Sequence, residues 1–227
     1  MSSTSQILLE STLQSSNRLE FWKTFVKQFE IESILEVGVF RGQFAEQMLL
    51  AENKIKSYWM VDPWRHLDDW NKPANKENEV FEKFYLETLR RTEFAEGKRI
   101  VLRGKTTEVV EQLPDGKIDL AYIDGDHTLR GITIDLVSIY PKVKEGGWIG
   151  GDDFSRTIWQ HGIEYEPTLV FPFAVYFAEA VGARVYALPY SQFLMQKSTS
   201  CTFEFIDLTE SYGNISLKEQ FLRAGHK

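Results

Sequence analysis

The stretch Ile118–Phe154, IDLAYIDGDHTLRGITIDLVSIYPKVKEGGWIGGDDF, decides the fold class of this chain. It begins with an apolar strand and an acidic loop, continues as an amphipathic helix, and ends with a glycine turn, a second apolar strand and a second acidic loop. Asp124 and Asp126 follow the first strand, and Asp152 and Asp153 follow the second. Ligands of an open α/β sheet bind beside the carboxyl ends of its strands. The stretch therefore predicts a ligand site in which two acidic loops meet.

A second signature, ILEVGVFRG at Ile34–Gly42, places a glycine-bearing turn between a strand and a helix. Glycines at Gly38 and Gly42 allow a ligand to approach the backbone, and the free amides of the helix start favour an anionic group. The spacing is not the G-x-G-x-x-G of dinucleotide sites, and by itself it is equally typical of a tight strand-to-helix turn. The next strand ends in Asp62, which suits the hydroxyls of a ribose but also suits a simple Asp-Pro turn.

The rest of the chain alternates between strands and helices, which predicts a mostly parallel sheet covered on both faces. The expected strands are Ser33–Val37, Ser57–Val61, Arg99–Leu102, Ile118–Ile123, Trp148–Gly151, Arg184–Leu188 and Gln192–Met195, with Thr202–Leu208 as a further edge strand. The expected helices are Arg18–Phe29, Gln43–Leu50, Glu79–Phe94, Thr107–Leu113, Leu129–Tyr140, Phe173–Val181 and Ser216–Leu222. Residues 1–17 are rich in Ser, Thr and Gln and are expected to form a mobile or loosely docked lead-in. We divide the chain into a lead-in and helix (1–32), a main domain (33–200) and a C-terminal extension packed on it (201–227).

Composition limits the class of protein and its partners. At 227 residues, 43% hydrophobic and 26% charged, the chain suits one soluble α/β domain. The net charge of -7 and the lack of a basic cluster argue against a nucleic-acid partner. The single cysteine, Cys201, forms no internal disulfide, and neither a signal peptide nor a membrane span is evident. We expect a cytoplasmic protein, and a homodimer is compatible with the sequence.

Five motifs in order resemble those of class I S-adenosylmethionine-dependent methyltransferases. They are LEVGVFRG, VDPW, RIVLRGKTTEVV, IDLAYIDGDHT and KEGGWIGGDDF, and the resemblance extends over Ile34–Lys197. Within that class the chain is similar to the group that contains the macrocin and catechol O-methyltransferases. The resemblance implies a Rossmann-like, doubly wound, three-layer αβα fold, whose seven-stranded sheet is mostly parallel with an antiparallel last strand.

The resemblance also implies a cofactor site for S-adenosylmethionine. The glycine turn would line the methionine end and the sugar, Asp62 would hold the ribose, and the turn after the third strand would flank the adenine. The implied cofactor-binding residues are Glu36, Gly38, Gly42, Asp62, Trp64 (as a cover), Gly104, Lys105, Thr106 and Asp124.

The acidic pocket has an implied metal and an implied base. Asp124, Asp152 and Asp153 match positions where catechol-type enzymes hold Mg²⁺, although those enzymes have Asn where this chain has Asp153. Hard divalent cations favour such oxygen ligands. His127 stands where these enzymes have a lysine base, and an ordinary histidine pKa near 6.5 suits removal of a hydroxyl proton. From the residues alone, the acids could instead cap helices or contact the cofactor amine, and His127 could be a helix-start histidine bonded to backbone.

These inferences predict an O-methyltransferase acting on a hydroxyl of a small molecule such as a phenol, a sugar or another secondary metabolite, with catalysis by His127 and Asp124. The acceptor is expected against the lead-in and two irregular segments, Arg65–Lys76 and Ser155–Phe171. The aromatic residues available there are Trp64, which borders the first segment, and Trp70, Trp159, Tyr165 and Phe171, which lie within the two segments. The competing hypotheses are a nicotinamide-dependent oxidoreductase on a Rossmann sheet and a non-catalytic binding protein that keeps the methyltransferase fold.

Overall fold

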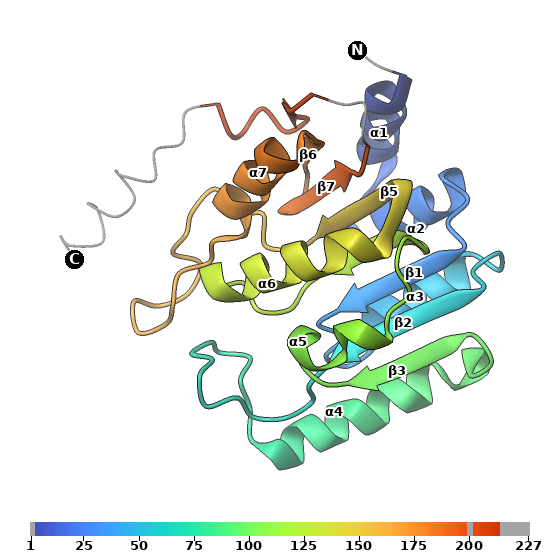
Figure 1. Cartoon of the computed structure of the whole chain (residues 1–227), viewed down its shortest axis with the longest axis vertical. Coiled ribbons are helices and arrows are strands. Elements are labelled where there is room, and N and C mark those ends of the chain that lie inside the picture. Colours follow the sequence, from blue (N-terminus) through green and yellow to red (C-terminus); the bar gives the residue numbers. More distant parts are fainter. Residues whose placement is uncertain (1–2, 199–201, 214–227) are drawn as a thin grey trace.

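The computed structural model describes residues 3–198 and 202–213. Within them one sheet has the strand order β3-β2-β1-β4-β5-β7-β6-β8 and carries helices on both faces (Figure 1). Its strands are β1 (Ser33–Val37), β2 (Ser57–Asp62), β3 (Arg99–Arg103), β4 (Ile118–Ile123), β5 (Val143–Gly151), β6 (Arg184–Leu188), β7 (Gln192–Gln196) and β8 (Glu204–Asp207). β7 runs antiparallel to both of its neighbours, and the other pairings are parallel. The predicted three-layer Rossmann-like fold with an antiparallel seventh strand is confirmed.

Two groups of helices cover the two faces. The helices are α1 (Ser3–Gln14), α2 (Arg18–Gln28), α3 (Gln43–Ala51), α4 (Asn78–Arg91), α5 (Thr106–Val109), α6 (Leu129–Ile139) and α7 (Val170–Val181), with short 3-10 turns η1 (Glu93–Ala95), η2 (Val110–Gln112) and η3 (Tyr140–Lys142). The apolar side chains of α1 to α4 pack in one core cluster, and those of α5 to α7 pack in the other. β4 separates the two, because Leu120 and Tyr122 face the first cluster while Ala121 and Ile123 face the second. Burial on both faces explains why this strand is apolar apart from Asp119 near its start.

The structure bears on two expectations from the sequence, the number of strands and the docking of the lead-in. The resemblance implied seven strands, and the eighth is β8, which pairs in parallel with β6 and confirms the further edge strand expected within Thr202–Leu208. The lead-in is not loosely docked: α1 is a helix that buries Leu8 completely in the first core cluster. The buried face of this helix consists of Leu8 and the small polar residues Ser5, Ser11 and Thr12, so its composition alone did not predict that it is docked. The expected helix at Ser216–Leu222 lies outside the described residues.

The order in which strands are added to the sheet reverses at β1, and this switch point creates the crevice for a ligand. From β1 the chain builds β2 and β3 on one side and then returns to place β4 on the other. Gly38 follows β1 with φ +89°, and a Cβ on it would lie 2.0 Å from the carbonyl oxygen of Asp124. Only glycine allows the loops after β1 and β4 to approach this closely. Among the described residues, no helix is both long and apolar enough to cross a membrane.

Candidate active site

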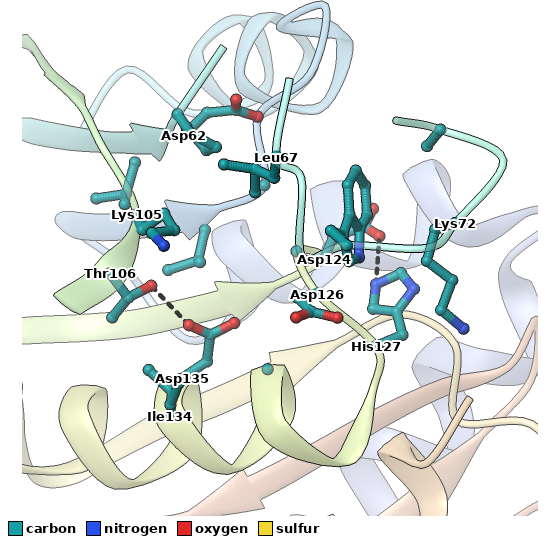
Figure 2. A pocket seen from close by; sticks show the side chains of 18 of the residues that line it. Asp62, Leu67, Lys72, Lys105, Thr106, Asp124, Asp126, His127, Ile134 and Asp135 are labelled. Atoms are coloured by element: carbon teal, nitrogen blue, oxygen red, sulfur yellow. Dashed lines mark hydrogen bonds and ion pairs between the residues drawn. The ribbon is translucent and has the colours of Figure 1, made fainter. Parts of the chain in front are cut away.

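A cavity of about 480 Å³ lies at the carboxyl ends of β1, β2, β3 and β4 (Figure 2). This volume is within the range of small-molecule sites. The residues predicted from sequence that line it come from the loops after these four strands and, for Asp153, from the loop after β5; they are Gly38, Asp62, Gly104, Lys105, Thr106, Asp124, His127 and Asp153. The structure therefore brings most of the predicted site residues together, as the carboxyl-end rule requires.

Four predicted residues do not line this cavity. Glu36 is buried beneath it and accepts a 2.6 Å hydrogen bond from the Tyr58 hydroxyl. Gly42 starts α3 with φ +73° against α4. Trp64 is completely buried, and its indole donates a 2.7 Å hydrogen bond to the Phe40 carbonyl, so it cannot cover an adenine in this arrangement. The fourth, Asp152, belongs to the acidic network described below.

Asp62 holds the glycine turn in shape. Its carboxylate accepts hydrogen bonds from the backbone amides of Phe40 at 2.8 Å and Trp64 at 2.7 Å. Burial raises the pKa of Asp62 to about 6, although those amide contacts act in the opposite direction. A carboxylate has roughly four acceptor positions, so Asp62 retains capacity for a ligand hydroxyl.

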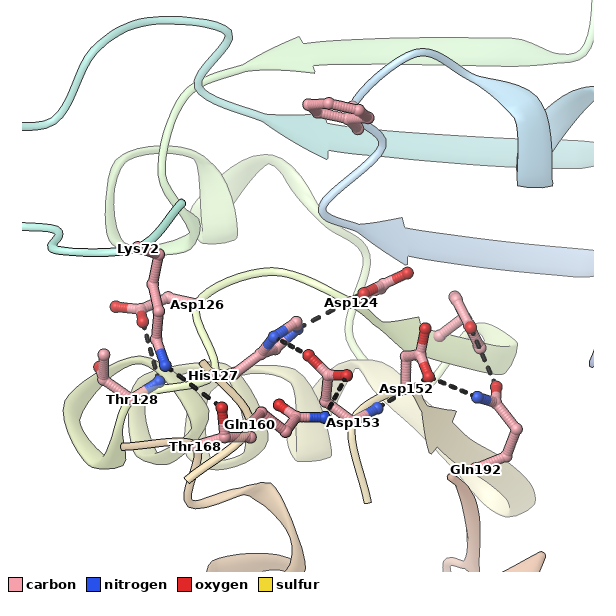
Figure 3. A network of polar contacts seen from close by, with 12 residues as sticks. Lys72, Asp124, Asp126, His127, Thr128, Asp152, Asp153, Gln160, Thr168 and Gln192 are labelled. Carbon is pink, nitrogen blue, oxygen red and sulfur yellow. Dashed lines mark hydrogen bonds and ion pairs between the residues drawn. The ribbon is translucent and has the colours of Figure 1, made fainter. Parts of the chain in front are cut away.

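His127 is the centre of a network of acids (Figure 3). Its Nε2 lies 3.4 Å from Asp124, and its Nδ1 contacts Asp153, whose carboxylate also accepts from Gln160 at 2.9 Å. Burial alone would lower the pKa of His127, but hydrogen bonds and charges from the two carboxylates prevail and raise it to about 10. The same pairing, opposed by burial, lowers the pKa of Asp153 to about 2. His127 is therefore an imidazolium at neutral pH, which can donate hydrogen bonds through both ring nitrogens and has no free nitrogen to accept a proton.

The three acids expected to bind magnesium are already held by cations of the protein. Arg18, from the start of α2, contacts Asp152 and lies 3.5 Å from Asp124, while His127 occupies Asp153. Across the described parts of the chain, no three His, Cys, Asp or Glu side chains form a group suited to a metal ion. The arrangement does not fit the predicted Mg²⁺ site, because a guanidinium and an imidazolium stand between the carboxylates. Sequence reasoning missed Arg18, since nothing local marks a helix-start arginine as part of this pocket.

The first irregular segment covers the cavity more than the second does. Leu67, Asp69, Trp70, Lys72, Pro73 and Ala74 line it, whereas His161 is the lining residue from Ser155–Phe171. Buried Lys72 ties the segments together by donating to the Glu166 carbonyl at 2.7 Å and to the Thr168 hydroxyl at 3.2 Å. Trp159, Tyr165 and Phe171, which the sequence suggested as acceptor contacts, do not line this cavity.

Asp135 is a second site residue that sequence reasoning missed. It lies on α6, is 5% exposed, lines the cavity and accepts a 2.6 Å hydrogen bond from the Thr106 hydroxyl (Figure 2). Burial, opposed by that hydrogen bond, raises the pKa of Asp135 to about 7. In the sequence it looks like one polar position of an amphipathic helix.

Comparison with known proteins identifies the family of this domain. Residues 35–154, which hold the glycine turn and both acidic loops, match the model of a methyltransferase domain. The chain belongs to that methyltransferase family. A curated relative, the uncharacterized protein R132 of Acanthamoeba polyphaga mimivirus, is 26% identical over 125 residues, 55% of this chain. The chain spans about half the length of that relative, 52%.

Solved structures share the fold at low sequence identity. A putative caffeoyl-CoA O-methyltransferase from Staphylococcus aureus superposes with a TM-score of 0.62 at 14% identity, over 86% of this chain and 93% of that one. The O-methyltransferase from Bacillus cereus in complex with SAH (S-adenosylhomocysteine) gives a TM-score of 0.56 at 16% identity, over 84% and 90%. The resemblance to class I methyltransferases is confirmed, and it leaves the nicotinamide-dependent alternative without support.

Proposed function

We propose that this protein transfers the methyl group of S-adenosylmethionine to a hydroxyl of a small molecule bound in the cavity. One observation carries the proposal: the glycine turn, Asp62 and the acidic loop after β4 converge on one cavity within a methyltransferase domain. The cofactor would lie across the crevice, with its ribose on Asp62 and its methionine end near Gly38. Its adenine would lie against the loop Gly104–Thr106.

The proposed reaction is a direct displacement. The acceptor oxygen attacks the methyl carbon of the sulfonium, the carbon–sulfur bond breaks with its electron pair going to the sulfur of S-adenosylhomocysteine, and the hydroxyl proton passes to water. Because the sulfonium is already an activated donor, holding the two reactants in line supplies much of the acceleration. We propose that the His127–Asp124 pair contacts the reacting hydroxyl from the cavity wall.

The flanking carboxylates change the role expected of His127. Held between Asp124 and Asp153, it is a cation, and a cation near the acceptor oxygen stabilises the oxyanion that develops as the proton leaves. In this role His127 orients the hydroxyl and lowers its pKa without taking the proton itself. No step of the proposal passes through a metal ion, since the predicted ligands are held by Arg18 and His127.

Calorimetric titration with S-adenosylhomocysteine tests the cofactor, and methyl transfer from labelled S-adenosylmethionine to a panel of phenols and sugars tests the reaction. We expect micromolar binding, about -8 kcal/mol, that Asp62→Ala weakens at least about ten-fold, a loss near that of one or two hydrogen bonds. Asp115→Ala is the matched control, because Asp115 pairs with Lys142 and does not line the cavity. A folded protein that does not bind the nucleoside would refute the proposal, and binding without transfer to any acceptor would favour the non-catalytic alternative.

The homodimer and the cytoplasmic location stay predictions.

A further inference from the structure

The carboxylate of Asp135 has one oxygen bound and one oxygen open to the cavity. Oδ1 accepts the hydrogen bond from Thr106 at 2.6 Å. Oδ2 accepts no hydrogen bond from the residues that the structure describes, and it lies 3.4 Å from the position that a Cβ on Gly125 would take. Figure 2 shows the second oxygen turned away from Thr106, toward the space between α6 and the loops after β3 and β4. The cavity wall thus presents an acceptor that has no donor within residues 3–198 and 202–213.

The position of this acceptor limits which part of a ligand meets it. Thr106 belongs to the loop after β3, and the neighbouring Gly104 amide donates to the Asp62 carbonyl at 3.0 Å. Asp62 is where the proposed function places the ribose, so the base of the nucleoside extends from there toward Thr106 and Asp135. Adenine carries one exocyclic amino group, a hydrogen-bond donor, whereas hypoxanthine carries a carbonyl oxygen at the same position.

A purely structural role explains Asp135 less well. A tie between α5 and α6 needs the one hydrogen bond with Thr106 and no second oxygen. Oδ2 has no donor among the described residues and depends on whatever fills the cavity for its hydrogen bond, and burial raises the pKa of Asp135 to about 7, which disfavours the charged form. A donor supplied by the ligand would give Oδ2 its hydrogen bond and would stabilise the charged form of Asp135.

We propose that Asp135 selects the adenine base, with Oδ2 accepting a hydrogen bond from its exocyclic amino group while Thr106 holds the carboxylate in place. This inference rests on the proposed function, because it assumes that the cavity binds S-adenosylmethionine and its demethylated product.

The test compares two nucleosides on the full-length protein by calorimetry: S-adenosylhomocysteine and its deaminated counterpart, S-inosylhomocysteine. At pH 9, where the Asp135 carboxyl is ionised because its pKa is about 7, wild type should bind the adenosine compound at least about ten-fold more tightly, since the hypoxanthine oxygen would face the Asp135 oxygen. In Asp135→Asn the amide oxygen can keep the Thr106 hydrogen bond and the amide nitrogen can donate to the hypoxanthine oxygen. The variant should therefore lose the preference for adenosine or reverse it.

Asp126→Asn is the matched control, because it removes the same charge from a residue that also lines the cavity but accepts from the Thr128 amide. It should leave the ratio of the two affinities unchanged. Equal affinity of wild type for both nucleosides, or an equal loss of both in Asp135→Asn, would overturn the inference and leave the cofactor assignment standing. If wild type bound neither nucleoside, the proposed function itself would fail. The wild-type comparison requires no variant, so the inference stays testable even if Asp135→Asn does not fold.

Discussion

Replacing Asp135 with asparagine should make the ligand-free protein less sensitive to rising pH. Burial raises the pKa of Asp135 from 3.8 to about 7, although the Thr106 hydrogen bond acts against the shift. Because the folded pKa is the higher one, the folded state binds more protons than the unfolded state between these values, and stability falls as pH rises through this window. The penalty is absent below the unfolded pKa and complete above about pH 7. Three pKa units correspond to about 4 kcal/mol in total.

Asparagine keeps the shape of the side chain and an acceptor for Thr106, but it carries no charge to desolvate. The difference in unfolding free energy between Asp135→Asn and wild type should therefore grow in favour of the variant by about 3 kcal/mol between pH 5 and pH 8. Urea unfolding followed by tryptophan fluorescence at four pH values measures this difference. The control is Asp115→Asn, which removes a carboxylate that is 77% exposed and should shift the curve uniformly and slightly. Parallel curves for Asp135→Asn and wild type would show that the folded pKa of Asp135 is ordinary and would contradict the predicted pH dependence.

Three further perturbations test the rest of the site. With a pKa of about 10 for His127, turnover should be nearly independent of pH between 7 and 9 and should fall roughly 10²-fold in His127→Gln; a ten-fold rise per pH unit that this variant abolishes would instead identify a general base. Gly38→Ala places a Cβ 2.0 Å from the Asp124 carbonyl oxygen, whereas Gly116→Ala has a similar left-handed backbone, φ +60°, and open space. Thermal unfolding should therefore show that Gly116→Ala lowers the free energy of unfolding by about 1 kcal/mol and that Gly38→Ala lowers it clearly more. Calorimetry should show that Gly38→Ala weakens cofactor binding and that Gly116→Ala does not. Excess EDTA should leave turnover unchanged while Arg18→Gln lowers it, and a loss on chelation that Mg²⁺ restores would reinstate the predicted metal site.

The parts of the site that were predictable lie where local sequence and strand geometry coincide. Apolar strands that end in Gly38, Asp62 and Asp124 must bring those residues to one edge of a parallel sheet, whatever packs around them. Glu36 lies in the same motif but points into the core toward Tyr58, because alternate residues of a strand face opposite sides of the sheet. A sequence motif therefore identifies the strand and the loop, and the alternation of side chains along the strand decides which of them face the cavity.

Contacts between distant segments were beyond local patterns. Arg18 reaches Asp152 across more than half of the chain, and Asp135 meets Thr106 from another helix. Both pairs depend on how helices dock on the sheet, which periodicity does not describe. The charge state of His127 is of the same kind, since it depends on two carboxylates from different loops acting together in a buried place.

Local patterns in the sequence predicted the order of strands and helices, the glycine turn after β1, the further edge strand that forms β8 and the edge of the sheet where the cavity lies, because alternation, glycine and strand-end acids act locally. Long-range packing placed α1 against the core and set Arg18 and His127 among the acids predicted to hold a metal. It also decided that Asp135 faces the cavity. These features follow from long-range packing and from charges in a poorly solvated cavity, where the partner of a side chain, rather than its place in a motif, determines its chemistry.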